Sequence, residues 1–280
     1  MSNSPAHQSG NSNVVRLEYR NVTMRFPQRN GRGTLTAVRG VSFSIRDGEV
    51  VSLIGPSGCG KSTLLNIGSG LTAPSEGAAF VDGEAVAGPQ SHVAFMLQKD
   101  LLLPWRTVAE NVMFGGEIQG VPAAERRQRA QQLLTNFNLA EFSGHYPHQL
   151  SGGMRQRVAL ARTLAVDPHV LLLDEPFPAV DAQTRMVLQR DLAQTLKQAG
   201  KTALLITHDL MEAVTLSDRV LVLSRRPGTI VDEILIEMPK RDDPIARRQN
   251  PKANDYTARL MDRLGIGHDG LEQQPAGSAT

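Results

Sequence analysis

The sequence predicts an α/β protein with a mostly parallel sheet flanked by helices, an N-terminal antiparallel β-subdomain and an inserted helical subdomain. Three observations predict this class. A short apolar strand at residues 50–54 runs into a glycine-rich turn and a helix. Strands alternate with helices from residue 154 onwards, which is typical of a parallel sheet covered on both faces. Between about residues 100 and 165 the pattern is helical instead.

The composition is that of an ordinary globular protein. Of its 280 residues, 40% are hydrophobic and 21% are charged, and the formal net charge is only +2. This balance argues against a large basic surface for nucleic acid, so we expect no nucleic-acid partner. The pI of about 8.8 does not exclude such a partner. With a single cysteine, Cys59, the chain cannot form an internal disulfide, which fits a reducing compartment.

The sequence predicts neither a membrane span nor a secretory signal. No apolar run approaches the ~20 residues that a spanning helix needs. Residues 1–13 are polar and lack the apolar segment of a signal peptide, so we expect them to form a disordered tail. We therefore expect a cytoplasmic protein that reaches any membrane through a partner.

Short strands dominate the beginning of the chain. Residues 14–26 and 35–50 carry apolar strand patterns, and turn residues separate them at 28–33 and follow at 47–48. Such segments predict a small, mainly antiparallel sheet. The next strand, "VVSLIG" at 50–55, is apolar throughout and leads into the glycine-rich turn.

The rest of the chain is expected to be helical at first and then alternating. Apolar residues at helical spacing predict helices in 107–116 and 122–137, the second with Pro122 in its first turn. The elements expected after them are a helix over 154–165, a strand over 170–174, a helix over 182–199, a strand over 202–207, a short helix, a strand near 218–224 and a short helix around Tyr256–Leu264.

"GPSGCGKST" carries the clearest chemistry. Residues 55–63 match the P-loop pattern G-x-x-x-x-G-K-[ST] between a predicted strand and a predicted helix. The glycines let successive N–H groups point at a phosphate, and the helix N-terminus adds a favourable dipole. We expect Lys61 to reach the β- and γ-phosphates and the Ser62 hydroxyl to bind Mg²⁺. The predicted nucleotide-binding residues here are Gly55, Pro56, Ser57, Gly58, Cys59, Gly60, Lys61, Ser62 and Thr63.

Two acids end the strand "VLLLDEP" at residues 170–176. Alone they are typical of a strand that meets a solvated turn. Beside a P-loop, they predict that Asp174 holds Mg²⁺ through water and that Glu175 deprotonates the attacking water. Gln98 and His208 also follow apolar strands. A glutamine can contact both metal and water, and a histidine can donate to a γ-phosphate, although His before Asp is also typical of a helix start.

Taken together, these motifs resemble the nucleotide-binding subunits of ATP-binding-cassette (ABC) transporters. The chain contains, in order, "GPSGCGKST", "LQKD", "LSGGMRQRVALAR", "VLLLDEP", "VD" and "ITHDLMEA", within about Phe26 to Arg219. The run "LSGG" followed by "RQRVALAR" is that family's signature. "LLLPWRTVAENV", "EPF..VDAQTR" and "LSRRPG" look like the nitrate, sulfonate and taurine group of importer ATPases. The resemblance implies a P-loop NTPase core that binds ATP and Mg²⁺ and hydrolyses ATP.

The resemblance also assigns a function to a second phosphate-binding pattern, "SGGMRQR" at residues 151–157. Alone, this pattern would be an ordinary capped helix whose free N–H groups suit an anion. In the family, this loop of one subunit covers the ATP held by the P-loop of another. The resemblance therefore implies that Ser151, Gly152 and Gly153 contact the γ-phosphate in a partner copy, and that a two-fold dimer completes both sites.

The family resemblance implies functions for several further residues. Phe26 would stack on adenine, although a Phe at a strand end is as often a core residue. Asp181 would lie on the dimer seam, in a loop that departs from the family pattern because it reads Pro178-Ala179-Val180-Asp181 and proline removes a donor. Leu101 to Trp105 would lie either near the groove that receives a helix of the membrane subunit or in the core. Gly68 falls in a predicted helix, where it costs about 1 kcal/mol relative to alanine.

The expected organisation is a tail at 1–13, an ABC ATPase domain at 14–240 with a helical subdomain inserted at about 100–165, and a polar C-terminal extension at 241–280. The expected protein is the energy-coupling ATPase subunit of an importer for a small anion or organic solute such as nitrate, taurine or alkyl sulfonate. It would lie peripherally at the cytoplasmic face of the inner (plasma) membrane. Its expected partners are a second copy of itself, transmembrane permease subunits and, indirectly, a solute-binding protein.

Two other classes remain open from the sequence. A soluble mechanical ATPase of the same superfamily would act on nucleic acid or ribosomes, but such chains usually carry two cassettes or a long coiled coil. A phosphotransferase would use the same P-loop without "LSGGMRQR". The solute is not encoded in this chain, because in such importers the permease and a binding protein select it.

Overall fold

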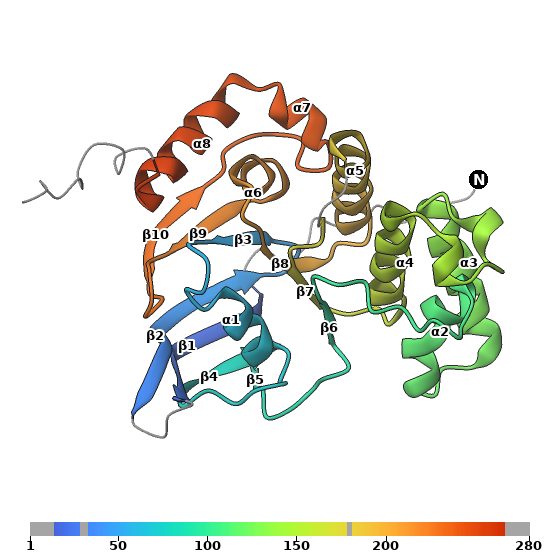
Figure 1. Ribbon diagram of the computed structural model, residues 1–280, viewed down its shortest axis with the longest axis horizontal. Helices are drawn as coiled ribbons and strands as arrows, with labels where there is room; N and C mark the ends of the chain where they lie inside the picture. The colour runs from blue at the N-terminus through green and yellow to red at the C-terminus, as the bar shows by residue number, and fades with distance from the viewer. Residues whose placement is uncertain (1–13, 29–32, 178–180, 267–280) are drawn as a thin grey trace, which may run out of the picture.

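The computed structural model contains two β-sheets with helices packed around them (Figure 1). The structure describes residues 14–28, 33–177 and 181–266, so the predicted tail at 1–13 lies outside the described residues. The strands are β1 (Val15–Pro27), β2 (Thr34–Arg46), β3 (Val50–Ile54), β4 (Glu76–Val81), β5 (Glu84–Ala85), β6 (Val93–Met96), β7 (Val170–Asp174), β8 (Thr202–Ile206), β9 (Arg219–Leu223) and β10 (Ile230–Leu235). The helices are α1 (Lys61–Gly68), α2 (Val108–Ile118), α3 (Ala123–Asn136), α4 (Gly152–Ala165), α5 (Ala182–Gln198), α6 (Leu210–Leu216), α7 (Pro244–Arg248) and α8 (Pro251–Leu264), with short 3-10 helices at Ala140–Phe142 and Pro147–Gln149.

The larger sheet has the strand order β10-β9-β3-β8-β7-β6. Strands β9, β3, β8, β7 and β6 pair in parallel, and the edge strand β10 pairs antiparallel with β9. In β7, Leu171 and Leu173 are buried in one core cluster while Val170 and Leu172 are buried in another. A strand buried on both faces is typical of a parallel sheet between two layers. The predicted α/β class with a mostly parallel sheet is confirmed.

The smaller sheet is antiparallel, with the order β2-β1-β4-β5. Its first two strands come from the segments in which the sequence predicts them. Tyr19 on β1 lies opposite Phe43 on β2, and the two rings stack with their centroids 4.5 Å apart. Leu64 and Leu65 of α1 join this sheet and one face of the larger sheet in a single core cluster. Strands β4 and β5 come from a stretch to which the sequence analysis assigns no strand.

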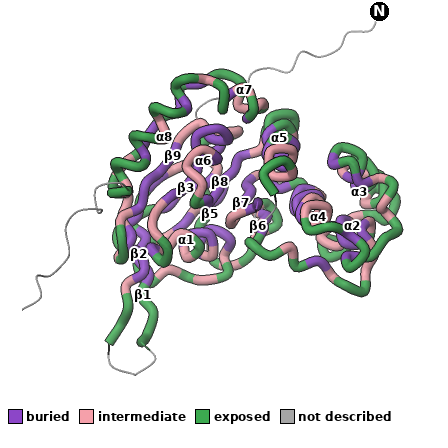
Figure 2. Tube along the Cα trace, turned by 45° about the horizontal axis from the view of Figure 1, so that its top comes forward, coloured by how far each residue is buried: buried purple, intermediate pink, exposed green. Residues whose placement is uncertain are grey.

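Helices α2, α3 and α4 form a group at the β6 side of the larger sheet (Figure 2). Helix α2 begins where the sequence places it, because Thr107 and Glu110 form a capping box. The Thr107 hydroxyl accepts from the Glu110 N–H, and the Glu110 carboxylate accepts from the Thr107 N–H at 2.7 Å. Helix α3 begins just after Pro122, which occupies the N-cap position without a side-chain hydrogen bond rather than lying in the first turn. Leu134 and Phe137 are fully buried in the core that this group shares with β7.

Beyond Lys240 the chain forms α7 and α8, which pack against α6. Helix α8 starts at Pro251, earlier than the short helix expected around Tyr256–Leu264. The Arg247 side chain is 3% exposed and donates to the carbonyl oxygens of Ser217, at 2.7 Å, and Pro239, at 3.0 Å. These contacts attach residues 241–264 to the core, while the proposed domain boundary at residue 240 stays a prediction.

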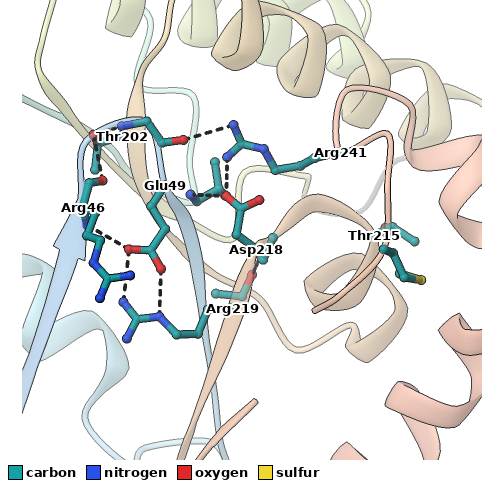
Figure 3. A network of polar contacts seen from close by, with 12 residues as sticks. Arg46, Glu49, Thr202, Thr215, Asp218, Arg219 and Arg241 are labelled. Carbon is teal, nitrogen blue, oxygen red and sulfur yellow. Dashed lines mark hydrogen bonds and ion pairs between the residues drawn. The ribbon is translucent and has the colours of Figure 1, made fainter. Parts of the chain in front are cut away.

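A polar network ties the same segment to the N-terminal ends of β3 and β9 (Figure 3). The Asp218 carboxylate accepts from the Val50 N–H at 2.9 Å and pairs with Arg241 at 2.8 Å. Next to it, Arg219 pairs with Glu49 at 2.9 Å. The strand that leads into the P-loop is therefore held at its base by residues 218–219 and by Arg241, which lie far from it in the sequence.

Gly68, which the sequence identifies as unfavourable in a helix, has a packing reason. A Cβ atom built on it would lie 2.2 Å from the Tyr19 hydroxyl oxygen. That hydroxyl is fixed because it donates to the Leu64 carbonyl oxygen at 2.8 Å and Tyr19 is 1% exposed. The cost of glycine in helix α1 is thus offset by the close approach of a buried tyrosine from β1.

We predict that Gly68→Ala lowers the free energy of unfolding by about 2 kcal/mol although alanine is the better helix former, because the new methyl group overpacks a fixed site. Tyr19→Phe removes the obstructing oxygen at a cost of about 1 kcal/mol for the lost hydrogen bond. The double variant should therefore lose less stability than the two single losses added, as measured by urea unfolding. Gly144→Ala is the control, since its Cβ meets no atom within 4 Å. Additive losses would contradict the explanation.

Candidate functional site

The sequence-predicted site residues follow neighbouring parallel strands of the larger sheet. Gly55 follows β3, Gln98 lies two residues after β6, and His208 lies two residues after β8. Asp174 is the last residue of β7, and Glu175 is the next. Because β3, β8, β7 and β6 are parallel and adjacent, their carboxyl ends meet at one edge of the sheet. The structure thus brings these five residues to one edge.

The P-loop connects β3 to α1 and presents backbone N–H groups. Helix α1 begins at Lys61 with no side-chain cap, so the N–H groups of its first turn face outward from the helix end. Its N-cap residue Gly60 has a φ of 107°, and a Cβ there would lie 2.3 Å from Val38. The Lys61 ammonium donates to the carbonyl oxygens of Gly55, at 2.8 Å, and Pro56, at 3.0 Å. This geometry is suited to holding a phosphate chain.

A cleft of about 320 Å³ opens over this loop. Phe26 lines it and is 38% exposed, so its ring is available to a flat ligand rather than being part of the core. The Cys59 side chain, in contrast, is 1% exposed within the core, so Cys59 offers only its backbone. The described residues lining the cleft are Phe26, Leu35, Ala37, Ser57, Gly58, Gly60, Lys61, Ser62, Thr63, Glu175 and Arg226. Sequence reasoning missed Leu35, Ala37 and Arg226 as site residues, although Arg226 lies within the "LSRRPG" segment that resembles the importer group.

Asp174 and Ser62 form a pair of oxygen donors beside the P-loop. Burial raises the pKa of the Asp174 carboxyl, and a hydrogen bond with the Ser62 hydroxyl opposes that rise. Mg²⁺ binds oxygen ligands and keeps several waters. A hydroxyl and a carboxylate in contact, next to a phosphate-binding loop, therefore fit this ion.

Glu175 is the point at which three of the predicted catalytic residues meet. The Gln98 amide donates to Glu175 Oε2 at 2.7 Å, and His208 Nδ1 lies 3.5 Å from the same oxygen. The Glu175 backbone has a φ of 47°, in the left-handed region, and its N–H donates to the Ile206 carbonyl oxygen at 2.9 Å. A residue held in a strained conformation at the mouth of a cleft is typical of a functional site. Its carboxylate can accept a proton from a water that enters the cleft.

The "SGG" loop lies apart from the P-loop cleft, since Ser151, Gly152 and Gly153 are absent from the described residues that line the cleft. Ser151 caps α4 by accepting from the Met154 N–H at 3.3 Å. A Cβ on Gly153 would lie 2.6 Å from the Thr184 methyl group, so this loop packs directly on the first turn of α5. The two patterns that the sequence predicts to bind phosphate therefore lie at separate places in one chain.

Asp181 caps α5 in that first turn. Its carboxylate accepts from the Thr184 N–H at 2.9 Å, and hydrogen bonds with Thr184 lower its pKa. Thr184 thus contacts both the "SGG" loop and Asp181. The other residues of the seam loop, Pro178, Ala179 and Val180, lie outside the described residues.

A buried polar pair joins α5 to α6 and was not anticipated from the sequence. The Gln189 amide donates to Glu212 Oε2 at 3.0 Å, and the two side chains are 2% and 3% exposed. Burial raises the pKa of Glu212 to about 7. Asp209, next to His208, caps α6 by accepting from the Glu212 N–H at 3.0 Å. The helix that follows His208 is thereby fixed to α5.

The segment from Leu101 to Trp105 divides between the two alternatives that the sequence left open. Leu102 is buried in the core, whereas Leu101 is 52% and Trp105 is 71% exposed. The start of the segment is anchored, because Arg162 donates to the carbonyl oxygens of Asp100 and Leu101, each at 2.7 Å. A groove of about 430 Å³ begins at Trp105 and continues along Arg106, Glu110, Met113, Glu117, Ala123, Arg126 and Arg127. None of the described helices combines the length and the apolar composition needed to cross a bilayer.

Comparisons with known proteins agree with this geometry. A family model described as ABC transporter matches residues 38–178. An uncharacterized ABC transporter ATP-binding protein of Methanocaldococcus jannaschii is 44% identical over 82% of this chain and 85% of its own length. The taurine import ATP-binding protein TauB of Yersinia pestis is 46% identical over 82% of this chain and 90% of its own. A solved dimeric ATP-binding cassette in a post-hydrolysis state, bound to ADP and Pi, has a TM-score of 0.70 and 32% identity over 79% of this chain and 99% of that one.

We predict that Glu212 makes stability fall as pH rises from 4.5 to about 7. The folded state keeps the Glu212 proton over this range because burial raises its pKa from 4.5 to about 7, whereas the unfolded state loses it. Glu212→Gln removes the titration. The free energy of unfolding of the variant relative to the wild type should therefore rise by up to about 3 kcal/mol between pH 4.5 and pH 7.5. Urea unfolding at several pH values measures it, with the exposed Glu125→Gln as control. A constant difference across this range would show that Glu212 does not titrate in this way.

Proposed function

The chain belongs to the ABC transporter family, and on this basis we propose that it is the energy-coupling ATPase subunit of an importer for a small anion or organic solute. The observation that carries the proposal is the meeting of Gln98, Glu175 and His208 beside the P-loop cleft. Taurine is the first solute to test, because relatives 42–47% identical to this chain are taurine import ATP-binding proteins. Nitrate and alkyl sulfonates remain the other candidates.

In the proposed reaction, the P-loop holds the phosphates of ATP and Phe26 supports the adenine ring. The Glu175 carboxylate accepts a proton from a water molecule as the water oxygen bonds to the γ-phosphorus. The bond from that phosphorus to the bridging oxygen breaks, and ADP and phosphate result. His208 donates to the γ-phosphate, and Gln98 orients the water. Ser62, Asp174 and Gln98 would hold Mg²⁺, which neutralises charge on the phosphates.

A second copy of the chain is proposed to complete each site. The "SGG" loop has free N–H groups at the start of α4 but does not line the cleft of its own chain. In a two-fold dimer, Ser151, Gly152 and Gly153 of one copy would cover the γ-phosphate bound to the other. Structurally similar cassettes were solved as dimers, which supports this arrangement. ATP binding would then close the dimer, and hydrolysis would open it.

The permease is proposed to dock at the groove that starts at Trp105. An exposed tryptophan is typical of an interface anchor, and Trp105 is 71% exposed. The charged residues around it, including Arg106 and Glu117 paired at 2.6 Å, would form the polar rim. The chain would thus lie peripherally at the cytoplasmic face of the inner membrane, and a solute-binding protein would deliver the solute to the permease from the other side.

We predict that Glu175→Gln retains ATP binding but lowers steady-state ATP turnover by roughly 10²-fold or more, because the amide cannot accept the water proton. The variant should accumulate as an ATP-bound dimer. Phosphate release measures turnover, and gel filtration with ATP measures the dimer. Glu84→Gln is the control, because Glu84 is exposed on β5. Near-normal turnover in Glu175→Gln would remove Glu175 from the role of base.

We further predict that the chain, gently tagged and purified from its native membranes, brings with it a multi-span membrane protein at about equal copy number. Trp105→Ala should reduce that recovery about tenfold or more, in the range of an interface anchor. The same variant should leave the ATP turnover of the isolated chain unchanged, because Trp105 does not line the P-loop cleft. Leu235→Ala, which alters an exposed leucine on β10, is the control. Recovery of ribosomes or DNA instead would refute the proposal that the chain is a subunit of an importer.

A further inference from the structure

The turn between β9 and β10, residues 224–229, lies against the P-loop although it is remote in sequence. The turn is closed by its own hydrogen bonds. The Ser224 N–H donates to the Thr229 carbonyl oxygen at 2.9 Å, and the Ser224 hydroxyl accepts from the Thr229 N–H at 3.0 Å. It contains "RRPG", a pattern to which neither the P-loop chemistry nor the dimer assigns a function.

Gly228 lies between β2 and the P-loop and contacts the backbone of both. Its N–H donates to the Ala37 carbonyl oxygen at 2.8 Å, and its carbonyl oxygen accepts from the Arg39 N–H at 3.0 Å. The turn therefore runs beside β2, as Figure 1 shows. A Cβ on Gly228 would lie 2.1 Å from the Cys59 carbonyl oxygen, so the two backbones touch with no room for a side chain. The position of the turn relative to the P-loop is thus fixed.

From this fixed turn, Arg226 reaches the middle of the P-loop. Its Nε and Nη2 donate to the Gly58 carbonyl oxygen at 2.9 and 2.7 Å. Because a peptide unit is planar and trans, holding that carbonyl also orients the Cys59 N–H in the opposite direction. This N–H donates to the Pro56 carbonyl oxygen at 3.3 Å, which closes the turn over residues 56–59. A P-loop binds phosphate through successive backbone N–H groups, and the contact of Arg226 fixes the loop that presents them.

Arg226 also places a positive charge at the rim of the P-loop cleft. Its side chain lines the cleft together with Phe26 and Lys61. Among the described residues, no carboxylate lies within ion-pair distance of it. Two of its five N–H donors are used on the Gly58 carbonyl, and the others stay available at an exposed position. A guanidinium without a carboxylate partner, next to a phosphate-binding loop, favours an anionic ligand.

We propose that Arg226 is a further positioning residue of the nucleotide site, which holds the Gly58–Cys59 peptide for phosphate binding and adds positive charge at the cleft. The ligand class is a nucleoside di- or triphosphate, so this inference rests on the nucleotide site of the proposed function. The effect falls on nucleotide affinity, because Arg226 contacts the P-loop at Gly58, whereas Gln98 and His208 are the residues that contact Glu175. Arg226→Gln therefore weakens binding and leaves turnover at saturating ATP nearly unchanged.

The test is calorimetric titration of the full-length chain with ADP, which binds without turnover. Arg226→Gln should raise the dissociation constant for ADP about tenfold at low salt. A higher salt concentration should reduce the difference in ADP affinity between the variant and the wild type. Arg226→Lys keeps the charge but not the planar fork, so it should lose only about threefold. The matched control is Arg20→Gln, which makes the same charge change at an arginine paired with Glu18 on β1 and outside the cleft.

Two further measurements separate this inference from a purely structural contact and from the proposed function. ATP turnover at saturating ATP should stay within about threefold of the wild type in Arg226→Gln, while KM rises with the dissociation constant. A lower melting temperature with unchanged ADP affinity, or equal losses in Arg226→Gln and Arg20→Gln, would overturn the inference and leave the ATPase intact. Failure of the wild type to bind ADP would overturn the nucleotide site itself, and both proposals with it.

Discussion

The site depends on one constraint, which is the parallel alignment of β3, β8, β7 and β6. The pairs Leu53 with Ile206, Ile206 with Asp174, and Leu173 with Met96 set the register. These strands are buried on both faces, so a slip of one residue would exchange the side chains that fill the two cores. Packing in the two cores therefore fixes where each strand ends. The residues that follow the strand ends are positioned at the cleft as a result.

This constraint explains which parts of the site the sequence could predict. The sequence predicts the P-loop, Asp174 and Glu175 because each motif lies within one short segment, whereas the predictions for Gln98 and His208 depend on the whole set of motifs. The parallel sheet was predictable because its strands are short apolar segments that alternate with helices. Strands β4, β5 and β10 lacked a distinct pattern. The contacts of Gly68 with Tyr19, and of Arg226 with Gly58, could not be predicted, because they join residues far apart in the chain that carry no shared pattern.

Helix α5 is the physical link between the "SGG" loop and the segment that carries His208. Its first turn contacts the "SGG" loop through Thr184 and is capped by Asp181. Further along, Arg185 lies 3.7 Å from Asp209, the residue after His208, and Gln189 bonds Glu212. A helix of 17 residues is stiff over this distance. A displacement of its first turn by a bound partner would therefore reach the segment that carries His208.

The glycine-rich P-loop is conformationally permissive, yet contacts from distant residues hold both the base of β3 and the loop itself. At the base of β3, Asp218 accepts from the Val50 N–H and pairs with Arg241. At the other end, the turn after β9 packs on Cys59 and donates to Gly58. Both anchors belong to the last quarter of the chain, which the P-loop pattern alone does not predict. Glycines can thus supply the close backbone approach that a phosphate needs, while distant residues supply the order that glycines lack.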